Sequence, residues 1–421
     1  MGLGGKGGAA VFWRWWAAGT TSGAGSAVGA VALPLTALNV LDASAFEMGL
    51  IAAAGYVAWI VIGLPAGVIV QRLPMRTVQV AADLARAAAV ASIPLAWWLD
   101  ELTIAQLVIV ALVISFANVL FDVANATFLP SIVSKEQLQS RNSLISGTHA
   151  TTQLGGPSVG GVVVQLLGAV PTLLVDAVSY LVSALLLRTL PDRRPESPDS
   201  RPPMREMIRE GWRFVARHPV MGPCMWAATA VNTVCGAQHA LYALYLVREL
   251  HAEPGLVGLL LAVEGVGTLV GAASASRLTA RFGTARTLVG SGFVAVAGAL
   301  VIPLGDGRPG FAAFAVGNVV FAGGVVVLSV LTRTYRQLAS PPELLSRVMA
   351  TVRFVSWGAI PVGGLVAGVI AGLLGARATL FVFVVAAVCA PLVLLASPIR
   401  RLRDLTDHQE STAGSQGVPI T

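Results

Sequence analysis

Twelve apolar runs, each about as long as a lipid bilayer is thick, constrain this chain more than any other feature. A helix needs about 20 mainly apolar residues to cross the hydrocarbon core. Only 12% of the 421 residues are charged, whereas soluble domains carry roughly 25%. We therefore predict an all-α polytopic membrane protein, with spans near 17–40, 47–70, 77–98, 102–125, 143–168, 170–190, 220–247, 254–277, 285–305, 310–333, 346–374 and 377–397.

The basic residues fall in alternate loops between these runs. One set of loops and both termini hold most of them, and the other side holds only Arg248, Arg308 and Arg377. Cytoplasmic loops carry an excess of Lys and Arg, so both termini are expected in the cytoplasm and the chain in the inner membrane of a bacterium. The net charge of +7 is explained by this orientation, and no nucleic-acid partner is expected.

The chain repeats itself at a spacing of 204 residues. Gly63 and Gly67 recur as Gly267 and Gly271, and Pro157 recurs as Pro361. Such repeats are typical of transporters whose halves rock around a central site. We expect four parts: a six-helix bundle (1–190), a cytoplasmic linker with an amphipathic helix (191–219), a second six-helix bundle (220–397) and a cytoplasmic tail (398–421).

Three segments contain further patterns. The loop after the second run, GLPAGVIVQRLPMR (63–76), contains Gly67, Gln71, Arg72 and Arg76. Asp122 ends the fourth run. The fifth run combines a helix-bending proline with glycines that let a neighbouring helix approach: Gly147, Gly156, Pro157, Gly160 and Gly161.

Together these segments resemble the major facilitator superfamily over roughly residues 12–397, nearest to the bacterial exporters of drugs and siderophores, including enterobactin exporters. The resemblance implies twelve transmembrane helices in two pseudo-symmetric six-helix bundles. It implies that Asp122 pairs with Arg72 or Arg76 as a gate and that Arg353 contacts the same loop. The glycine–proline segment resembles an antiporter motif that favours export. Gln71 stands where the family has an acid, and Thr152 where it has a glycine.

Ionisable residues inside a membrane are functional candidates. Glu264 lies in the middle of the eighth run and Asp176 in the sixth, while Asp83 stands three residues before Arg86. All three carboxylates are candidates for proton coupling, and each also has a purely structural interpretation as a paired or hydrogen-bonded residue. Polar residues of the fifth and seventh runs are expected to line a cavity or to serve packing: His149, Gln153, Asn232, Gln238 and His239.

No ATP-binding motif, catalytic constellation, metal cluster or cofactor motif is visible, so an ion gradient is the expected energy source. We predict a monomeric secondary exporter of small amphipathic molecules such as drugs, natural products or siderophores, coupled to the proton gradient by alternating access. The alternatives are an importer, facilitator or lipid flippase of the same superfamily. A membrane sensor or intramembrane enzyme is the remaining alternative, although no soluble domain or convergent catalytic group supports it.

Overall fold

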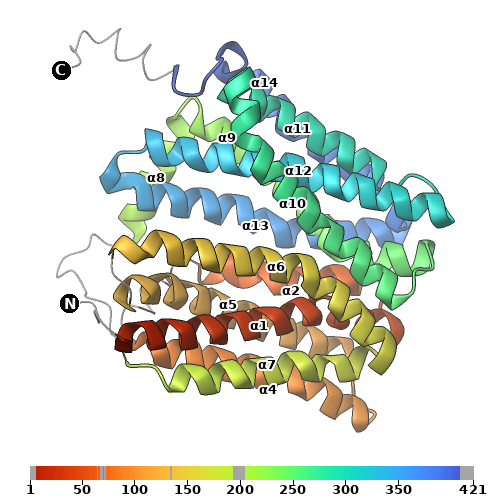
Figure 1. The fold of residues 1–421 in the computed structure, drawn as a ribbon. Coiled ribbons are helices and arrows are strands. Elements are labelled where there is room, and N and C mark those ends of the chain that lie inside the picture. Colours follow the sequence, from red (N-terminus) through yellow and green to blue (C-terminus); the bar gives the residue numbers. More distant parts are fainter. Residues whose placement is uncertain are drawn as a thin grey trace. The chain divides into compact units, whose positions relative to one another are not determined.

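The computed structural model describes residues 6–63, 65–66, 70, 73–132, 135–192 and 204–407. Within these residues the chain is helical throughout, as predicted (Figure 1). The long helices are α1 (Lys6–Asn39), α2 (Ala45–Val61), α4 (Met75–Trp98), α5 (Ile104–Ile132), α6 (Lys135–Leu167), α7 (Ala169–Arg188), α8 (Met204–Arg217), α9 (Met221–Leu244), α10 (Pro254–Phe282), α11 (Thr284–Val301), α12 (Gly307–Ala339), α13 (Pro342–Leu374) and α14 (Ala376–Ala396).

Each predicted span overlaps one of these helices, although α2 ends at Val61, earlier than the predicted span 47–70, and α8 is the predicted amphipathic helix. In the described part of the chain, nine helices are long and apolar enough to cross a membrane. Of the other three that match predicted runs, α2 is short, and α6 and α9 carry polar residues such as His149 and His239. Helices suit this environment because lipid offers no partner to a backbone N–H or C=O.

The helices form two compact units. The first unit comprises Met1–Asp199, His239–Ala262 and Gly364–Ala376, and the second comprises the remaining residues. The first unit therefore contains the end of α9, the start of α10 and the end of α13. The six-helix halves expected from the repeat, 1–190 and 220–397, stay a prediction, and residues 193–203 of the predicted linker lie outside the described part.

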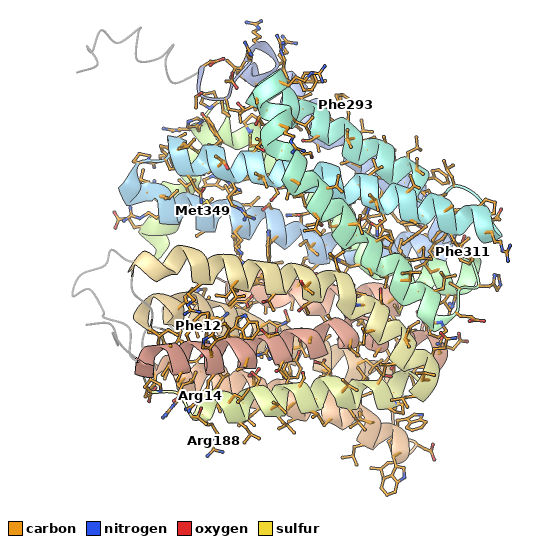
Figure 2. All side chains as sticks on the ribbon, viewed as in Figure 1. Phe12, Arg14, Arg188, Phe293, Phe311 and Met349 are labelled. Carbon is orange, nitrogen blue, oxygen red and sulfur yellow. The ribbon has the colours of Figure 1, made fainter. Side chains whose placement is uncertain are left out.

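In each unit, the linker end is the end of the helices next to the arginine-rich loops, and the far end is the opposite one. In the first unit, Arg14 near the start of α1 and Arg188 at the end of α7 lie at the same linker end (Figure 2). The helix α7 packs against both α1 and α4 in this unit.

Single glycines make the sharp turns between α6 and α7 and between α13 and α14. Gly168 has φ +88° and Gly375 has φ +84°, a left-handed conformation that costs a residue with a Cβ atom free energy. Each glycine follows a helix with an internal proline, Pro157 in α6 and Pro361 in α13. The matching turns extend the internal repeat seen in the sequence.

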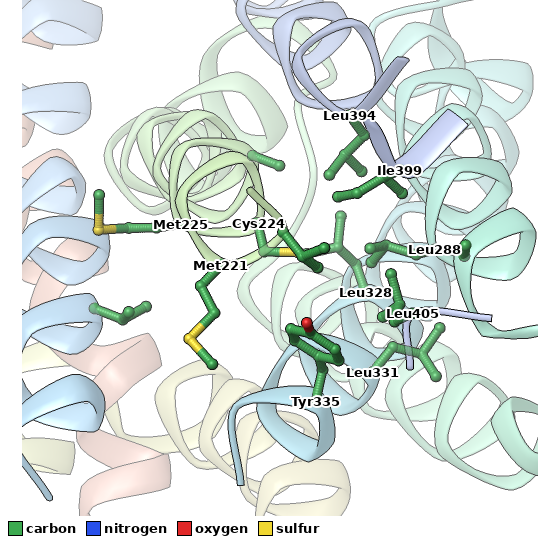
Figure 3. Close-up of a cluster of buried hydrophobic side chains, with 14 of the residues drawn as sticks. Met221, Cys224, Met225, Leu288, Leu328, Leu331, Tyr335, Leu394, Ile399 and Leu405 are labelled. Atoms are coloured by element: carbon green, nitrogen blue, oxygen red, sulfur yellow. The ribbon is translucent and has the colours of Figure 1, made fainter. Parts of the chain in front are cut away.

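In the second unit, an apolar cluster joins α9, α11, α12 and α14 to the segment after α14 (Figure 3). Ile399 and Leu405 of that segment are buried among Cys224, Leu288 and Leu331. The Asp404 carboxylate accepts the Thr284 N–H at 2.8 Å at the start of α11. The predicted tail thus begins with a docked segment, and residues 408–421 lie outside the described part.

We expect Leu405→Ala to detach this segment, because truncating a buried leucine costs about 2 to 5 kcal/mol. The amide of Leu405, which donates to Thr284 Oγ1 at 2.8 Å, and that of Ala285, which donates to the Arg403 carbonyl at 3.0 Å, should then exchange hydrogen faster. Hydrogen–deuterium exchange of the detergent-solubilised protein measures this. The neighbouring exposed residue provides the control, Thr406→Ala, and equal exchange in both variants would refute the docking.

Candidate functional site

A cluster of charged and polar side chains lies buried among α1, α4, α5 and α7 in the first unit. Arg86 of α4 forms an ion pair with Asp83 on the same helix and donates to the Asn118 side chain of α5 at 2.8 Å. Ser183 of α7 donates to the second Asp83 oxygen at 2.6 Å. Asp83 is 0% and Arg86 4% exposed. Three helices are therefore joined through one buried ion pair.

Asp176 of α7 brings a second carboxylate to this cluster. Its side chain is 4% exposed, and its Oδ1 atom has no hydrogen-bond partner in the described part of the chain. The Asp176 charge interacts with the Arg86 guanidinium. One turn further along α7, the Tyr180 ring lies against that guanidinium at 4.6 Å, and its hydroxyl shares a 2.8 Å hydrogen bond with Ser26 of α1.

The charges of this cluster do not balance. Asp83 and Asp176 would contribute two negative charges if both were ionised, whereas Arg86 is the one cation in the described part of the chain that is shown to interact with them. An uncompensated charge in an apolar interior is costly. The two carboxylates therefore share one described cation.

Two glycines of α1 make room for Asp176. A Cβ atom at Gly29 would lie 3.0 Å from Asp176 Cγ, and one at Gly25 would lie 3.1 Å from Asp176 Oδ1 and 2.5 Å from Ser179 Cβ. All three distances are shorter than ordinary contacts of a Cβ atom. We call Gly25 and Gly29 the glycine notch. It brings the α1 backbone onto the polar face of α7.

Sequence reasoning indicated the Asp83–Arg86 pair but missed the polar residues around it and around Asp176. Ser179, Tyr180 and Ser183 follow Asp176 at the i+3, i+4 and i+7 positions, which lie on one face of a helix. This polar stripe on α7 was visible in the sequence and would have pointed to these three residues. Ser26 and Asn118 carried no such signal, because they belong to other helices.

Glycines also mediate helix contacts at the far end of the first unit. A Cβ atom at Gly161 of α6 would lie 2.9 Å from Gly258 Cα of α10. A Cβ atom at Gly49 of α2 would lie 3.0 Å from Gly368 Cα of α13. Arg248, near the end of α9, adds an ion pair with Asp42 at 2.7 Å. The α2–α13 and α6–α10 pairs are therefore packed backbone to backbone.

The antiporter-like segment takes part in this packing. Gly160 faces the Val28 backbone of α1, Gly156 faces Ala27, and the Pro157 carbonyl faces Gly258. Gly147 differs, because a Cβ atom there would meet nothing within 4 Å. Four of the five residues of the predicted motif thus lie at helix contacts.

The predicted loop gate falls largely outside the described part, which omits Gly67, Gln71 and Arg72. Arg76 lies 3.6 Å from the Asp192 carboxylate and donates to the Leu190 carbonyl at 3.0 Å. Asp122 is exposed at the linker end of α5. Its pairing with an arginine stays a prediction. Arg353 lies over the Trp357 ring at 4.4 Å.

The other polar candidates differ in exposure. Glu264 of α10 is exposed. Gln238 is 7% exposed, and the half-exposed Asn232 donates to the Ser356 carbonyl at 2.8 Å. Their place in a cavity wall stays a prediction. His149 is exposed, and the exposed His239 ring stacks on Tyr56 at 5.3 Å. The Gln153 side chain lies outside the described part. The searched, described residues contain no group of three or more potential metal ligands.

The long packed helices, nine of them apolar enough to span a membrane in the described part of the chain, match the fold of solved membrane transporters. Among solved structures, the nucleoside transporter NupG superposes with a TM-score of 0.72 at 10% identity, covering 92% of this chain and 98% of that one. A bacterial homologue of the iron transporter ferroportin, in an inward-facing state, superposes with a TM-score of 0.70 at 15% identity, covering 92% and 98%. At these identities the likeness shows the fold alone.

The family described as transmembrane secretion effector matches residues 8–416, and the chain belongs to this family of major facilitator transporters. The multidrug efflux pump Tap of Mycolicibacterium fortuitum is 27% identical over 402 residues, covering 91% of this chain and 94% of the relative. The uncharacterized MFS-type transporter YvqJ of Bacillus subtilis is 25% identical over 304 residues, covering 70% of each.

The glycine notch generates a prediction with its own controls on α1. We expect Gly29→Val to displace Asp176 and to lower both thermal stability in detergent and transport, because the added side chain would meet the Asp176 carboxyl group. Gly19→Val and Gly23→Val place the same side chain where a Cβ atom meets nothing within 4 Å. Equal melting temperatures for all three variants would contradict the close packing of the glycine notch against Asp176.

Proposed function

We propose that this chain is a proton-coupled exporter of small amphipathic molecules that works by alternating access. Its membership in a family of secretion effectors and its similarity to Tap, which is named a multidrug efflux pump, support transport outward. The proposed location is the bacterial inner membrane, with the linker end and both termini in the cytoplasm. The arginines at that end support this orientation.

The charge imbalance of the buried cluster carries the proposal for coupling. Asp83 is held by Arg86 and Ser183, whereas Asp176 keeps an oxygen without a partner in the described part. Asp176 is therefore the carboxylate that binds and releases the proton. A change in the packing of α1 against α7 would alter its distance from water and from Arg86, which links proton binding to helix movement.

The far end of the first unit supports a gating role for its glycines. Alternating access requires helices at one end to separate while those at the other end close. Contacts made only by glycine backbones are close yet involve few side chains that must rearrange. In our proposal the α2–α13 and α6–α10 contacts are the gate of the far end, and the Arg248–Asp42 pair fastens it.

Glu264 remains a second candidate for coupling. It is exposed on α10. An exposed carboxylate can bind a cationic substrate as readily as a proton. We therefore assign Glu264 to substrate contact or to proton coupling. The two roles differ in whether the effect of a Glu264 variant on the transport rate depends on the charge of the substrate.

Transport by purified protein in liposomes tests the proposed function. We expect a proton gradient to drive uptake of a fluorescent amphipathic dye such as ethidium into vesicles whose interior is acidic, with proton release reported by a pH-sensitive dye. Dye movement independent of the gradient would indicate a facilitator. Movement of a fluorescent phospholipid between leaflets in place of the dye would indicate a flippase, and no movement of either would refute transport of this class of substrate.

Asp176→Asn is expected to reduce gradient-driven dye transport by at least about tenfold while the protein still folds, because the amide cannot exchange a proton. The control variant is Asp306→Asn, which changes the exposed carboxylate that pairs with Arg377. Measuring proton release when dye is added distinguishes a loss of proton coupling from a loss of dye binding. Unchanged proton release by Asp176→Asn would remove this residue from the mechanism.

Gly161→Val and Gly49→Val are expected to lower the transport rate about tenfold or more, because the new side chains prevent the far end from closing. Gly155→Val on α6 and Gly55→Val on α2 are matched controls, since a Cβ atom at either glycine meets nothing within 4 Å. Initial rates of dye uptake at equal amounts of protein provide the comparison. Similar rates for all four variants would exclude the proposed gate.

A further inference from the structure

The amphipathic helix α8, at the linker end of the second unit, has a surface that the transport mechanism does not use. The helix is fixed to α13 on one side. Gly211 is buried, and a Cβ atom there would lie 2.8 Å from the Arg347 carbonyl oxygen and 2.5 Å from Thr351 Oγ1. Val215, one turn on, is 0% exposed, and Glu210 forms an ion pair with Arg347. These contacts determine which face of α8 points outward.

The same contacts determine the depth of α8 in the membrane. Arg347 lies at the start of the apolar run predicted at 346–374, and Thr351 lies one turn further along it. A helix that packs on the first turn of a span lies where the lipid headgroups meet water. Amphipathic helices with basic residues and tryptophan occupy this layer.

The outward face of α8 is basic and carries an aromatic side chain. Arg209, Arg213 and Arg217 are exposed and follow one another at four-residue spacing, so their side chains form a row on the helix. Trp212 beside this row is 42% exposed. In the described part of the chain, none of the three arginines forms an ion pair with a carboxylate.

We propose that this row binds the headgroup phosphate of an anionic phospholipid, of the phosphatidylglycerol class, in the adjoining leaflet. A guanidinium group binds phosphate through two parallel hydrogen bonds, and a tryptophan next to it is suited to the headgroup layer. Glu206 is the remaining acid on α8 and is also exposed, which leaves the face with a net positive charge. The depth of α8 favours lipid over an acidic protein of the cytosol.

The proposal is independent of the transported substrate and is tested by binding alone. Ala216 is exposed on the same side of α8, and an environment-sensitive fluorophore on Ala216→Cys would report a bound lipid. The chain has only three cysteines, Cys224, Cys235 and Cys389, which are first replaced by alanine. Short-chain phosphatidylglycerol is then titrated into the detergent-solubilised protein, with short-chain phosphatidylcholine and inorganic phosphate as separate probes.

We expect saturable binding of phosphatidylglycerol and none of phosphatidylcholine or free phosphate. The double variant Arg209→Gln/Arg213→Gln should weaken binding about thirty-fold, since each arginine near a lipid surface contributes about 1 kcal/mol. The double variant Arg400→Gln/Arg401→Gln makes the same change of charge at two exposed arginines after α14 and should bind normally.

Three results would overturn the proposal. Equal weakening by both double variants would show a general charge effect without a site on α8. Equal binding of both phospholipids would show that the headgroup charge is not recognised. A soluble acidic peptide that competes with phosphatidylglycerol at similar concentration would identify the surface as a protein-docking site. Circular dichroism of each variant confirms that α8 and its neighbours remain helical.

Discussion

The absence of water in the bilayer is the constraint on which this structure depends. Every backbone N–H and C=O group within the membrane needs a partner inside the protein, so each spanning segment is a helix. Lipid tails are as apolar as leucine, so burial of apolar side chains does not by itself hold these helices together. Close packing replaces it, and glycine is the residue that permits the closest approach, as at Gly161 against Gly258 and Gly49 against Gly368.

The same medium explains why the buried cluster of the first unit is unusual. Asp83 and Arg86 neutralise each other, and Asn118 and Ser183 complete their hydrogen bonds. Asp176 adds a charge without adding a compensating cation. On α1, Gly25 and Gly29 lack side chains and so leave space for the Asp176 carboxyl group. A purely structural ion pair would need neither the second carboxylate nor the notch. The cluster therefore combines a paired carboxylate, Asp83, with a second one, Asp176, whose Oδ1 has no hydrogen-bond partner in the described part of the chain.

At the linker end, the chain packs by burying apolar side chains away from water, as water-soluble proteins do. The segment after α14 docks by burying Ile399 and Leu405, and Asp404 accepts a hydrogen bond from the start of α11. The helix α8 docks by Val215 and Gly211 and leaves its arginines exposed. Here the hydrophobic effect is available, and it buries Val215 while Trp212 stays 42% exposed.

The sequence by itself determined the helical class, the approximate position of each span and the amphipathic nature of α8, because these follow from the length and periodicity of apolar runs. It also indicated the Asp83–Arg86 pair, since residues three apart share a helix face. Only the tertiary structure decided that Asp176 joins this pair, that Glu264 is exposed, and that Gln238 is buried. The reason is physical: in a membrane both the lipid-facing and the inner faces of a helix are apolar, so periodicity cannot tell which face meets which neighbour.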